Sequence, residues 1–244
     1  MRIDTLALQM RPRAPHEAAD LGIRLCQSTA GAVFRCYLLV AIPVAVIALS
    51  LFEIRPWLPA LVFWLSKPWL DRTVLFVLAR AAFGQSTTVR DLWNSRGEVW
   101  GRQFFVTWTW RRLSPWRSFT QPVYQLEGLP FFETRQRVVQ LKRRYTGAAF
   151  ATTHAFLFSE LGLMLTFMSL TFWLAPPDPN FDMTKLFGPE GDTARQLMST
   201  FAYMGAVLFI EPFYVAAGFG MYLNRRAELE AWDIEQEFRR AFAN

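Results

Sequence analysis

Five charged side chains lie inside segments of this chain that are otherwise apolar and long enough to cross a membrane. They are Lys67, Asp71, Arg72, Glu160 and Glu211. A charge is costly in the hydrocarbon of a bilayer, so such residues usually face the interior of a helix bundle and pair there. These positions restrict which helix faces can meet, and they predict a polar centre inside an apolar bundle.

Four apolar runs have the length of about 20 residues that is needed to cross roughly 30 Å of hydrocarbon. They are residues 33–52, 57–83, 148–174 and 197–223. The second run could stop near Ser66 and resume as an interfacial helix from Thr73, but nine or ten apolar residues cannot cross alone. We therefore expect one long, kinked helix there. The sequence predicts an all-α polytopic membrane protein with about four transmembrane helices in two hairpins.

The composition agrees with a single membrane domain. The 244 residues are 52% hydrophobic and 19% charged, whereas soluble domains have about 25% charged residues. The expected parts are an N-terminal amphipathic segment (1–32), a first hairpin (33–83), a cytoplasmic interfacial segment (84–147), a second hairpin (148–223) and a cytoplasmic tail helix (224–244). Cys26 and Cys36 are ten residues apart and point to different helix faces, so we expect no disulfide between them.

Basic residues near the ends of the apolar runs predict the orientation, because they are enriched on the cytoplasmic side. Residues 84–147 contain eleven Lys and Arg against four acidic residues, whereas residues 175–195 contain four acidic residues against two basic ones. The first segment is therefore expected in the cytoplasm and the second outside. This places both termini in the cytoplasm and the protein in the bacterial cytoplasmic (inner) membrane.

Two of the runs contain a short similar pattern of a charge, a proline and an aromatic residue. The pattern is Lys67-Pro68-Trp69 in the second run and Glu211-Pro212-Phe213 in the fourth. Proline frees a backbone carbonyl in the preceding turn, and in lipid that carbonyl must be satisfied within the protein.

Small residues four apart let another helix approach closely. The residues expected at helix contacts are Pro68, Pro212, Ala216 and Gly220.

The five buried charges can reach a common layer of the membrane. At about 1.5 Å per residue, each lies at a similar distance from the cytoplasmic end of its run, with Lys67 one turn deeper. Two bases and three acids are close to neutral if one acid is protonated, which burial favours. The cluster is either a salt-bridge network that fixes helix packing or a proton relay, ion relay or substrate site. The sequence leaves both open.

The segments outside the runs have the composition of a membrane surface. Residues 88–119 mix Arg with Trp, as in-plane helices and loops at an interface do, and a basic helix is expected from Phe132 to Tyr145. The predicted contacts with anionic headgroups are Arg135, Arg137, Lys142, Arg143 and Arg144. Lipid attraction explains this charge, so we expect no nucleic-acid partner. Short amphipathic helices are expected from Pro15 and over 227–241, the latter under the bundle or against a partner.

The stretch from Tyr222 to Glu235 has the pattern Tyr-x-x-Arg, Arg-x-Glu and Asp-Ile just after the last run. It resembles a group of uncharacterised bacterial multi-pass membrane proteins, which is similar to the membrane domain attached to some glycerophosphodiester phosphodiesterases. Residues 67–72 and 114–119 are also similar to members of that group. The resemblance implies an integral membrane fold but no catalytic residues, because the phosphodiesterase domain is outside the match.

The sequence contains no recognisable enzyme motif. Its only histidines are His16 and His154, which excludes a multi-histidine metal site, and it has no Gly-x-Ser-x-Gly elbow and no P-loop. We therefore expect no catalytic residue, metal or cofactor. The leading hypothesis is a non-enzymatic subunit or scaffold of an envelope complex that binds a membrane protein or a second copy of itself.

The alternative hypothesis is a small transporter or lipid-handling protein that uses the intramembrane charges. Packing of the charged cluster discriminates between the two. A tightly packed cluster without a cavity favours the scaffold. A cavity that reaches Glu160, Glu211 or Arg72 favours the transporter or lipid-handling protein.

Overall fold

Every regular element that the structure describes is helical. The computed structural model describes residues 13–101, 114–173, 188 and 191–230. The elements are α1 (Pro15–Ser28), α2 (Ala30–Leu49), η2 (Ser50–Glu53), α3 (Leu58–Ala82), α4 (Val89–Asn94), η3 (Gly97–Gly101), α6 (Arg117–Pro122), η4 (Val123–Glu127), α7 (Phe131–Trp173) and α9 (Asp192–Glu230). The predicted all-α class is confirmed for these residues.

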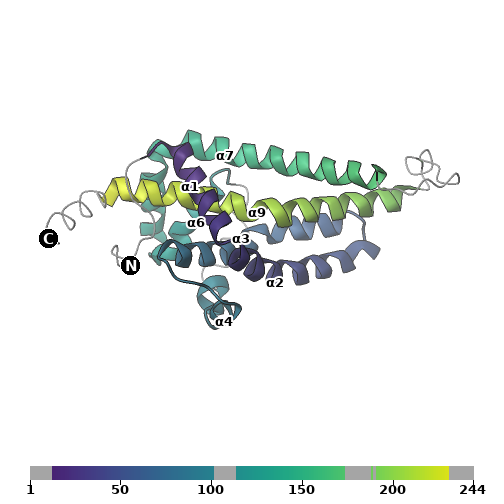
Figure 1. The fold of residues 1–244 in the computed structure, drawn as a ribbon, viewed down its shortest axis with the longest axis horizontal. Coiled ribbons are helices and arrows are strands. Elements are labelled where there is room, and N and C mark those ends of the chain that lie inside the picture. The colour runs from purple at the N-terminus through teal and green to yellow at the C-terminus, as the bar shows by residue number, and fades with distance from the viewer. Residues whose placement is uncertain (1–12, 102–113, 174–187, 189–190, 231–244) are drawn as a thin grey trace.

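Helix α9 is the centre of the bundle. Figure 1 shows α7 along one side of it, α3 and α2 along the other, and α1 crossing it. Its residues from Tyr214 to Asn224 are buried without exception. The first described residues and the last turn of α9 lie at one end of the molecule, because Arg13 and Asn224 exchange two hydrogen bonds. The turn between α2 and α3 lies at the opposite end (Figure 1).

Three helical stretches among the described residues are long and apolar enough to cross a membrane. They are Ala30–Glu53, Phe132–Leu170 and Asp192–Glu230. Helix α3 is not among them, although it has 25 residues, and it contains three of the five buried charges. It is one continuous helix with Pro68 inside it, so the alternative of a break between Ser66 and Thr73 is wrong.

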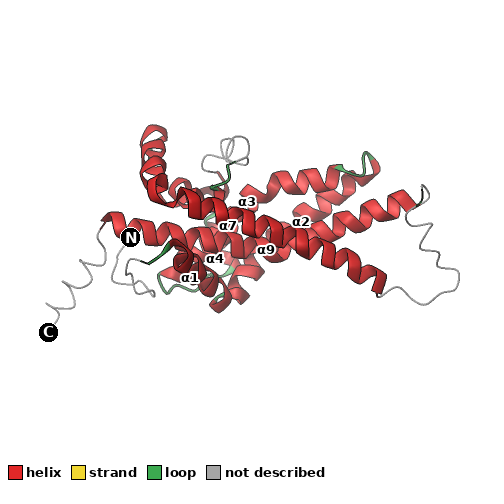
Figure 2. Ribbon diagram, turned by 90° about the horizontal axis from the view of Figure 1, so that it is seen from above, coloured by secondary structure: helices red, strands yellow, loops and turns green. Residues whose placement is uncertain are grey.

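Helix α7 is longer than a membrane span. Its 43 residues correspond to about 65 Å, more than twice the thickness of a hydrocarbon core. The predicted basic helix from Phe132 to Tyr145 is its first part, and no break separates it from the apolar run that follows. In the view from above, α7 crosses α9, and the C-terminal end of α7 separates from the N-terminal end of α9 (Figure 2).

Glycines in α9 allow two other helices to approach its backbone. A Cβ added at Gly220 would overlap the carbonyl oxygen of Ala18 in α1 and lie 2.9 Å from the amide nitrogen of Gly22. A Cβ added at Gly218 would overlap the backbone of Ser118 in α6. The predicted N-terminal amphipathic helix is confirmed as α1, which begins at Pro15 and crosses α9 at this point.

The stretch from α6 to η4 is buried in the bundle. Ser118 to Pro122 and Val123 are all buried, and the stretch ends at Gly128, whose φ of 64° suits a residue without a side chain. The sequence analysis placed residues 88–119 at the lipid interface, and for Ser118 and Phe119 that is wrong. Ser118 packs against α9 and Phe119 stacks on Tyr145 of α7, which composition does not reveal. Residues 102–113 lie outside the described part.

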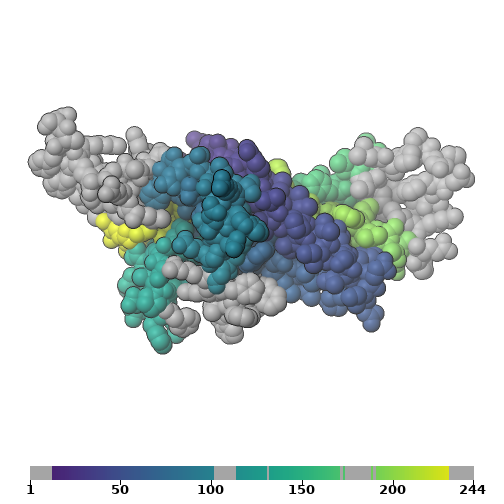
Figure 3. Space-filling view, turned by 90° about the horizontal axis from the view of Figure 1, so that it is seen from below, coloured from purple at the N-terminus to yellow at the C-terminus, as the bar shows by residue number. Residues whose placement is uncertain are grey.

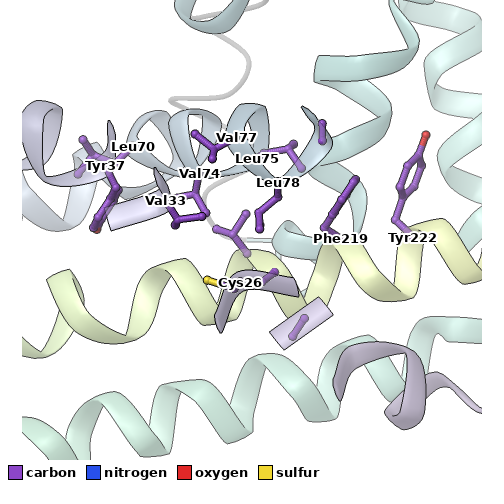
Figure 4. Packing of buried hydrophobic residues seen from close by; sticks show 14 of the residues in the cluster. Cys26, Val33, Tyr37, Leu70, Val74, Leu75, Val77, Leu78, Phe219 and Tyr222 are labelled. Carbon is purple, nitrogen blue, oxygen red and sulfur yellow. The ribbon is translucent and has the colours of Figure 1, made fainter. Parts of the chain in front are cut away.

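The apolar core lies where α1, α2, α3 and α9 meet. Figure 4 shows Val33 and Tyr37 of α2 beside Leu70 and Val74 of α3, with Cys26 of α1 near α9. In the space-filling view from below, α2 and α3 form one continuous surface, with the α4 region against its end (Figure 3). The N-terminal half of the bundle is therefore closely packed, and α7 is attached to it mainly through α9.

Polar side chains hold the end of α9 to its neighbours. The Tyr222 hydroxyl donates to Glu127 of η4 at 2.7 Å, and the Tyr145 hydroxyl of α7 donates to Glu228 at 2.6 Å. Arg137 of α7 forms ion pairs with Glu127 and Glu230. The described part of the stretch from Tyr222 onward thus contributes to helix packing. The remainder of the predicted tail helix, 231–244, lies outside the described residues.

Candidate functional site: a buried ion-pair cluster and its cavities

Lys67 joins three helices through two carboxylates. Its Nζ lies 2.6 Å from Oε2 of Glu160 in α7 and 2.7 Å from Oε2 of Glu211 in α9. The Lys67 side chain is 8% exposed, Glu160 13% and Glu211 2%. Lys67 of α3 is therefore shared between a carboxylate of α7 and a carboxylate of α9. If either carboxylate is removed, Lys67 keeps the other.

Arg117 is the second base of the cluster, and the sequence analysis did not include it. Its guanidinium forms an ion pair with Oε1 of Glu211, and its Nε lies 3.2 Å from Oδ2 of Asp71. Glu211 therefore contacts both bases, one with each carboxylate oxygen. Asp71 has no exposed side-chain surface, and neither of its oxygens accepts a hydrogen bond from the described residues.

Local contacts hold Arg117 in place. Its Cζ lies 5.2 Å from the centroid of the Tyr214 ring, a cation–π arrangement. Thr153 of α7 donates to the carbonyl of Pro115 at 2.6 Å, and its hydroxyl lies 3.2 Å from that of Tyr214. Arg117 is the first residue of α6, so the packing of α6 on α9 places the arginine inside the bundle. Arg117 lies outside the four apolar runs, so a search for charges inside those runs does not find it.

Arg72 does not make the ion pairs that its position suggested. It is buried, at 2% exposure, one residue after Asp71, but Lys67 and Arg117 make the contacts with Glu160 and Glu211. The Arg72 carbonyl accepts a hydrogen bond from Gln125 of η4 at 2.8 Å. On a helix, residues 71 and 72 point about 100° apart, so Asp71 and Arg72 face different neighbours.

Acidic side chains outnumber basic ones in the ion pairs of the described cluster. Asp71, Glu160 and Glu211 face Lys67 and Arg117. If all five groups are ionised, one negative charge remains. Glu160 is the most exposed of the three carboxylates and the one on α7, the helix at the edge of the bundle.

A small cavity of about 130 Å³ adjoins the ion pairs. Its charged lining consists of Lys67, Arg117, Glu160 and Glu211, and Tyr214 and Thr153 also face it. A space of this size with several polar partners can hold water or a small polar group. The cluster is therefore not filled by protein atoms alone.

A larger, mostly apolar cavity of about 500 Å³ lies next to it, between α3, α7 and α9. Its lining is Ala60, Leu61, Trp64, Leu157, Glu160, Leu161, Met164, Ser199, Thr200 and Tyr203. Trp64, Leu157 and Glu160 line both cavities. The volume lies in the range of roughly 300–1,000 Å³ that is typical of ligand pockets. The Glu160 side chain therefore has the ion pairs on one side and a mostly apolar cavity on the other.

The residues expected at helix contacts lie in the densest part of the bundle. Pro68, Pro212, Ala216 and Gly220 are all buried. Gly220 faces α1, as described above, and a Cβ on Gly22 of α1 would overlap the backbone of Ala216. The carbonyl of Pro68 lies 3.4 Å from the Gln121 side-chain nitrogen. This contact gives α6 a polar link to α3.

The five predicted headgroup contacts are in different environments. Arg135, Arg143 and Arg144 are exposed on α7. Arg137 points into the protein, where its ion pairs with Glu127 and Glu230 replace a lipid contact. The Lys142 Nζ lies 3.3 Å from the centre of the Trp116 ring. Exposed charge that could meet lipid headgroups is therefore concentrated on three of the five.

The described residues contain no group of three or more His, Cys, Asp or Glu side chains that could hold a metal ion. Comparisons of the chain with protein-family models, curated proteins and solved structures find no match. The function is therefore inferred from the geometry of the cluster and its cavities.

Proposed function

We propose that this protein binds an amphipathic molecule within the membrane, as a small transporter or lipid-handling protein does. The observation that carries the proposal is that Glu160 lines both the small cavity beside the ion pairs and the larger apolar cavity. A charge network that only fixes helix packing has no need of space beside it. A site for an amphiphile requires charged or polar groups at one end and an apolar enclosure at the other.

The proposal includes a membrane arrangement with α3 as the fourth span. Its charges are paired inside the bundle, which removes much of the cost of placing them in hydrocarbon. The turn after α2 and the beginning of α9 would then lie outside the cell. The basic first part of α7 and the end of α9 would lie in the cytoplasm, in two hairpins across a bacterial inner membrane.

The alternative of a non-enzymatic scaffold in an envelope complex predicts a filled cluster, and the cavities favour binding over it. A partner membrane protein or a second copy remains compatible with the amphiphile proposal. The exposed apolar side chains of α7 face lipid in either case.

Two matched serine variants test the proposal. Ser199 lines the apolar cavity, and its hydroxyl donates to the carbonyl of Gln196 at 2.9 Å. Ser169 is exposed near the end of α7 and makes the same kind of bond, to Thr166 at 3.0 Å. Ser199→Trp fills the cavity, whereas Ser169→Trp places the same ring against lipid.

The measurement is native mass spectrometry of protein that is purified from membranes and washed extensively in mild detergent. Wild type and Ser169→Trp are expected to retain one bound amphiphile, and Ser199→Trp to lose it. Equal retention by the two variants, or wild type without any bound molecule, would contradict the proposal.

A further inference from the structure

We infer that the molecule in this space carries a positively charged amine or quaternary ammonium group at the end of a hydrocarbon chain. The inference rests on the proposed binding function and specifies the class of ligand. Its basis is the juxtaposition of the Glu160 carboxylate with the aromatic side chains of Trp64 and Tyr203 at the wall of an apolar cavity.

The charges around the cavity favour a cation. Both bases are already engaged, since Lys67 contacts Glu160 and Glu211, and Arg117 contacts Asp71 and shares Glu211. An anionic headgroup would have to displace a carboxylate from one of these pairs and then lie beside it. A cationic group would instead meet Glu160, which is the one acid of the cluster in the lining of the apolar cavity and belongs to a cluster with three acids and two bases.

The aromatic residues favour the same class. Trp64 lines both cavities and Tyr203 lines the apolar one, so two aromatic side chains share the lining of the apolar cavity with Glu160. A carboxylate with aromatic rings is the combination that binds amine and quaternary ammonium groups. A quaternary ammonium group is also easier to remove from water than a metal ion, because its charge is spread over carbon-bound hydrogens.

The rest of the cavity accommodates the chain of the ligand. Ala60, Leu61, Leu161 and Met164 come from α3 and α7 and contribute no hydrogen-bonding side chain. A hydrocarbon chain placed here would leave the cationic end at Glu160. The amine could belong to a membrane lipid headgroup or to a free long-chain amine, and both have the chemistry that the site recognises.

The experiment uses three probes with the same chain and different heads: dodecyltrimethylammonium, dodecyl sulfate and dodecanol. Binding to the full-length protein in a non-ionic detergent is measured by native mass spectrometry. Wild type is expected to bind the ammonium probe at least about tenfold more tightly than the sulfate probe. Glu160→Gln should weaken ammonium binding by about tenfold or more and leave dodecanol binding unchanged, as expected when a charge-assisted contact is removed.

A second variant keeps the test valid if Glu160→Gln does not fold. Trp64→Leu removes one π face and should weaken binding of the ammonium probe more than that of dodecanol. Competition between the ammonium probe and lipid separates the two sources of the amine. Binding of the probe is compared in lipid discs of phosphatidylglycerol alone and in discs that also contain phosphatidylethanolamine. Displacement of the probe by the amine-bearing lipid assigns the head to a membrane lipid, and persistence of the probe assigns it to a free amine.

Two outcomes separate the inference from the proposed function. If all three probes bind equally and Ser199→Trp blocks all of them, the site binds amphiphiles but the cationic class is wrong. If Ser199→Trp blocks none of them, both the inference and the proposed function are wrong. Preference for the sulfate probe would likewise overturn the inference.

Discussion

At the scale of single residues, the three acids of the cluster have unequal roles. Glu211 is almost fully buried and contacts both bases, whereas Glu160 contacts one base and faces the cavities. A buried charge whose partner is removed cannot regain water and destabilises the fold. The same chemical change at the two positions should therefore have different consequences.

Glu211→Gln is expected to destabilise the protein by about 3–5 kcal/mol, because it weakens the contacts of both Lys67 and Arg117. Glu160→Gln should cost at most about 1 kcal/mol, since its amide can still accept a hydrogen bond from Lys67 and the variant removes the excess negative charge. Thermal unfolding of both purified variants in mild detergent measures the difference. Equal losses would contradict the assignment of Glu211 as the central acid.

Arg117→Leu tests the base that the sequence did not reveal. It leaves Asp71 and Glu211 as neighbouring buried carboxylates without their shared cation, so a loss of about 3–5 kcal/mol is expected. Addition of Asp71→Leu to the same chain should recover part of that loss. Arg72→Leu combined with Asp71→Leu is the control, for which we expect no such recovery. A double-mutant cycle on thermal unfolding gives the coupling directly.

At the scale of helices, the bundle depends on the crossing of α1 and α9. Gly220→Ala should destabilise the protein by about 1–3 kcal/mol, because the added methyl group overlaps the backbone of Ala18 and not a side chain that could rotate away. Gly162→Ala on α7 is the matched control. A Cβ there has no atom within 4 Å, and alanine favours a helix. A harmless Gly220→Ala would mean that α1 does not dock as described.

The helices themselves could largely be predicted from the sequence, and the reason differs between them. The continuity of α3 through Pro68 followed from membrane thickness, because neither half of the run is long enough to cross alone. The burial of α6 could not be predicted. Six residues contain too little periodicity to define a buried face, and its placement depends on Gly218 of α9 and on hydrogen bonds to α3.

The charged cluster could also be predicted only in part. Charges inside apolar runs are visible in a sequence, so Lys67, Asp71, Glu160 and Glu211 could be identified. Arg117 lies outside every run and enters the bundle through tertiary contacts of α6, so periodicity could not find it. Arg72 was expected among the ion-pair partners because its depth along the helix matches that of the two glutamates. Depth alone does not give the direction in which each side chain points around the helix axis.

At the scale of the whole molecule, orientation in the membrane is the most general prediction. Ile54 is 65% exposed in the turn after α2, and Gln140 is exposed on the basic part of α7. Ile54→Cys should react with an impermeant maleimide on intact cells. Gln140→Cys should react only after the cells are permeabilised. The reverse result, or labelling of both in intact cells, would contradict the orientation.

The native cysteines should not interfere with this labelling. Cys26 and Cys36 are both buried, and burial raises the pKa of the Cys26 thiol to about 12. Since a maleimide reacts with the thiolate, a pKa above the ordinary value keeps Cys26 protonated and unreactive at pH 7–8. Wild-type protein is the control and should remain unlabelled in the folded state.

The central claim is that Glu160 lies within the membrane and lines the apolar cavity, whereas Glu211 lines only the small cavity beside the ion pairs. Dicyclohexylcarbodiimide, which dissolves in lipid, adds to a reachable carboxyl group as an N-acylurea, and peptide mass spectrometry locates the adduct. In intact membranes Glu160 should be modified and Glu211 unmodified. Ser199→Trp should reduce the adduct, Ser169→Trp should not, and a water-soluble carbodiimide should give none. An unmodified Glu160, or one that reacts equally with the water-soluble reagent, would contradict the account.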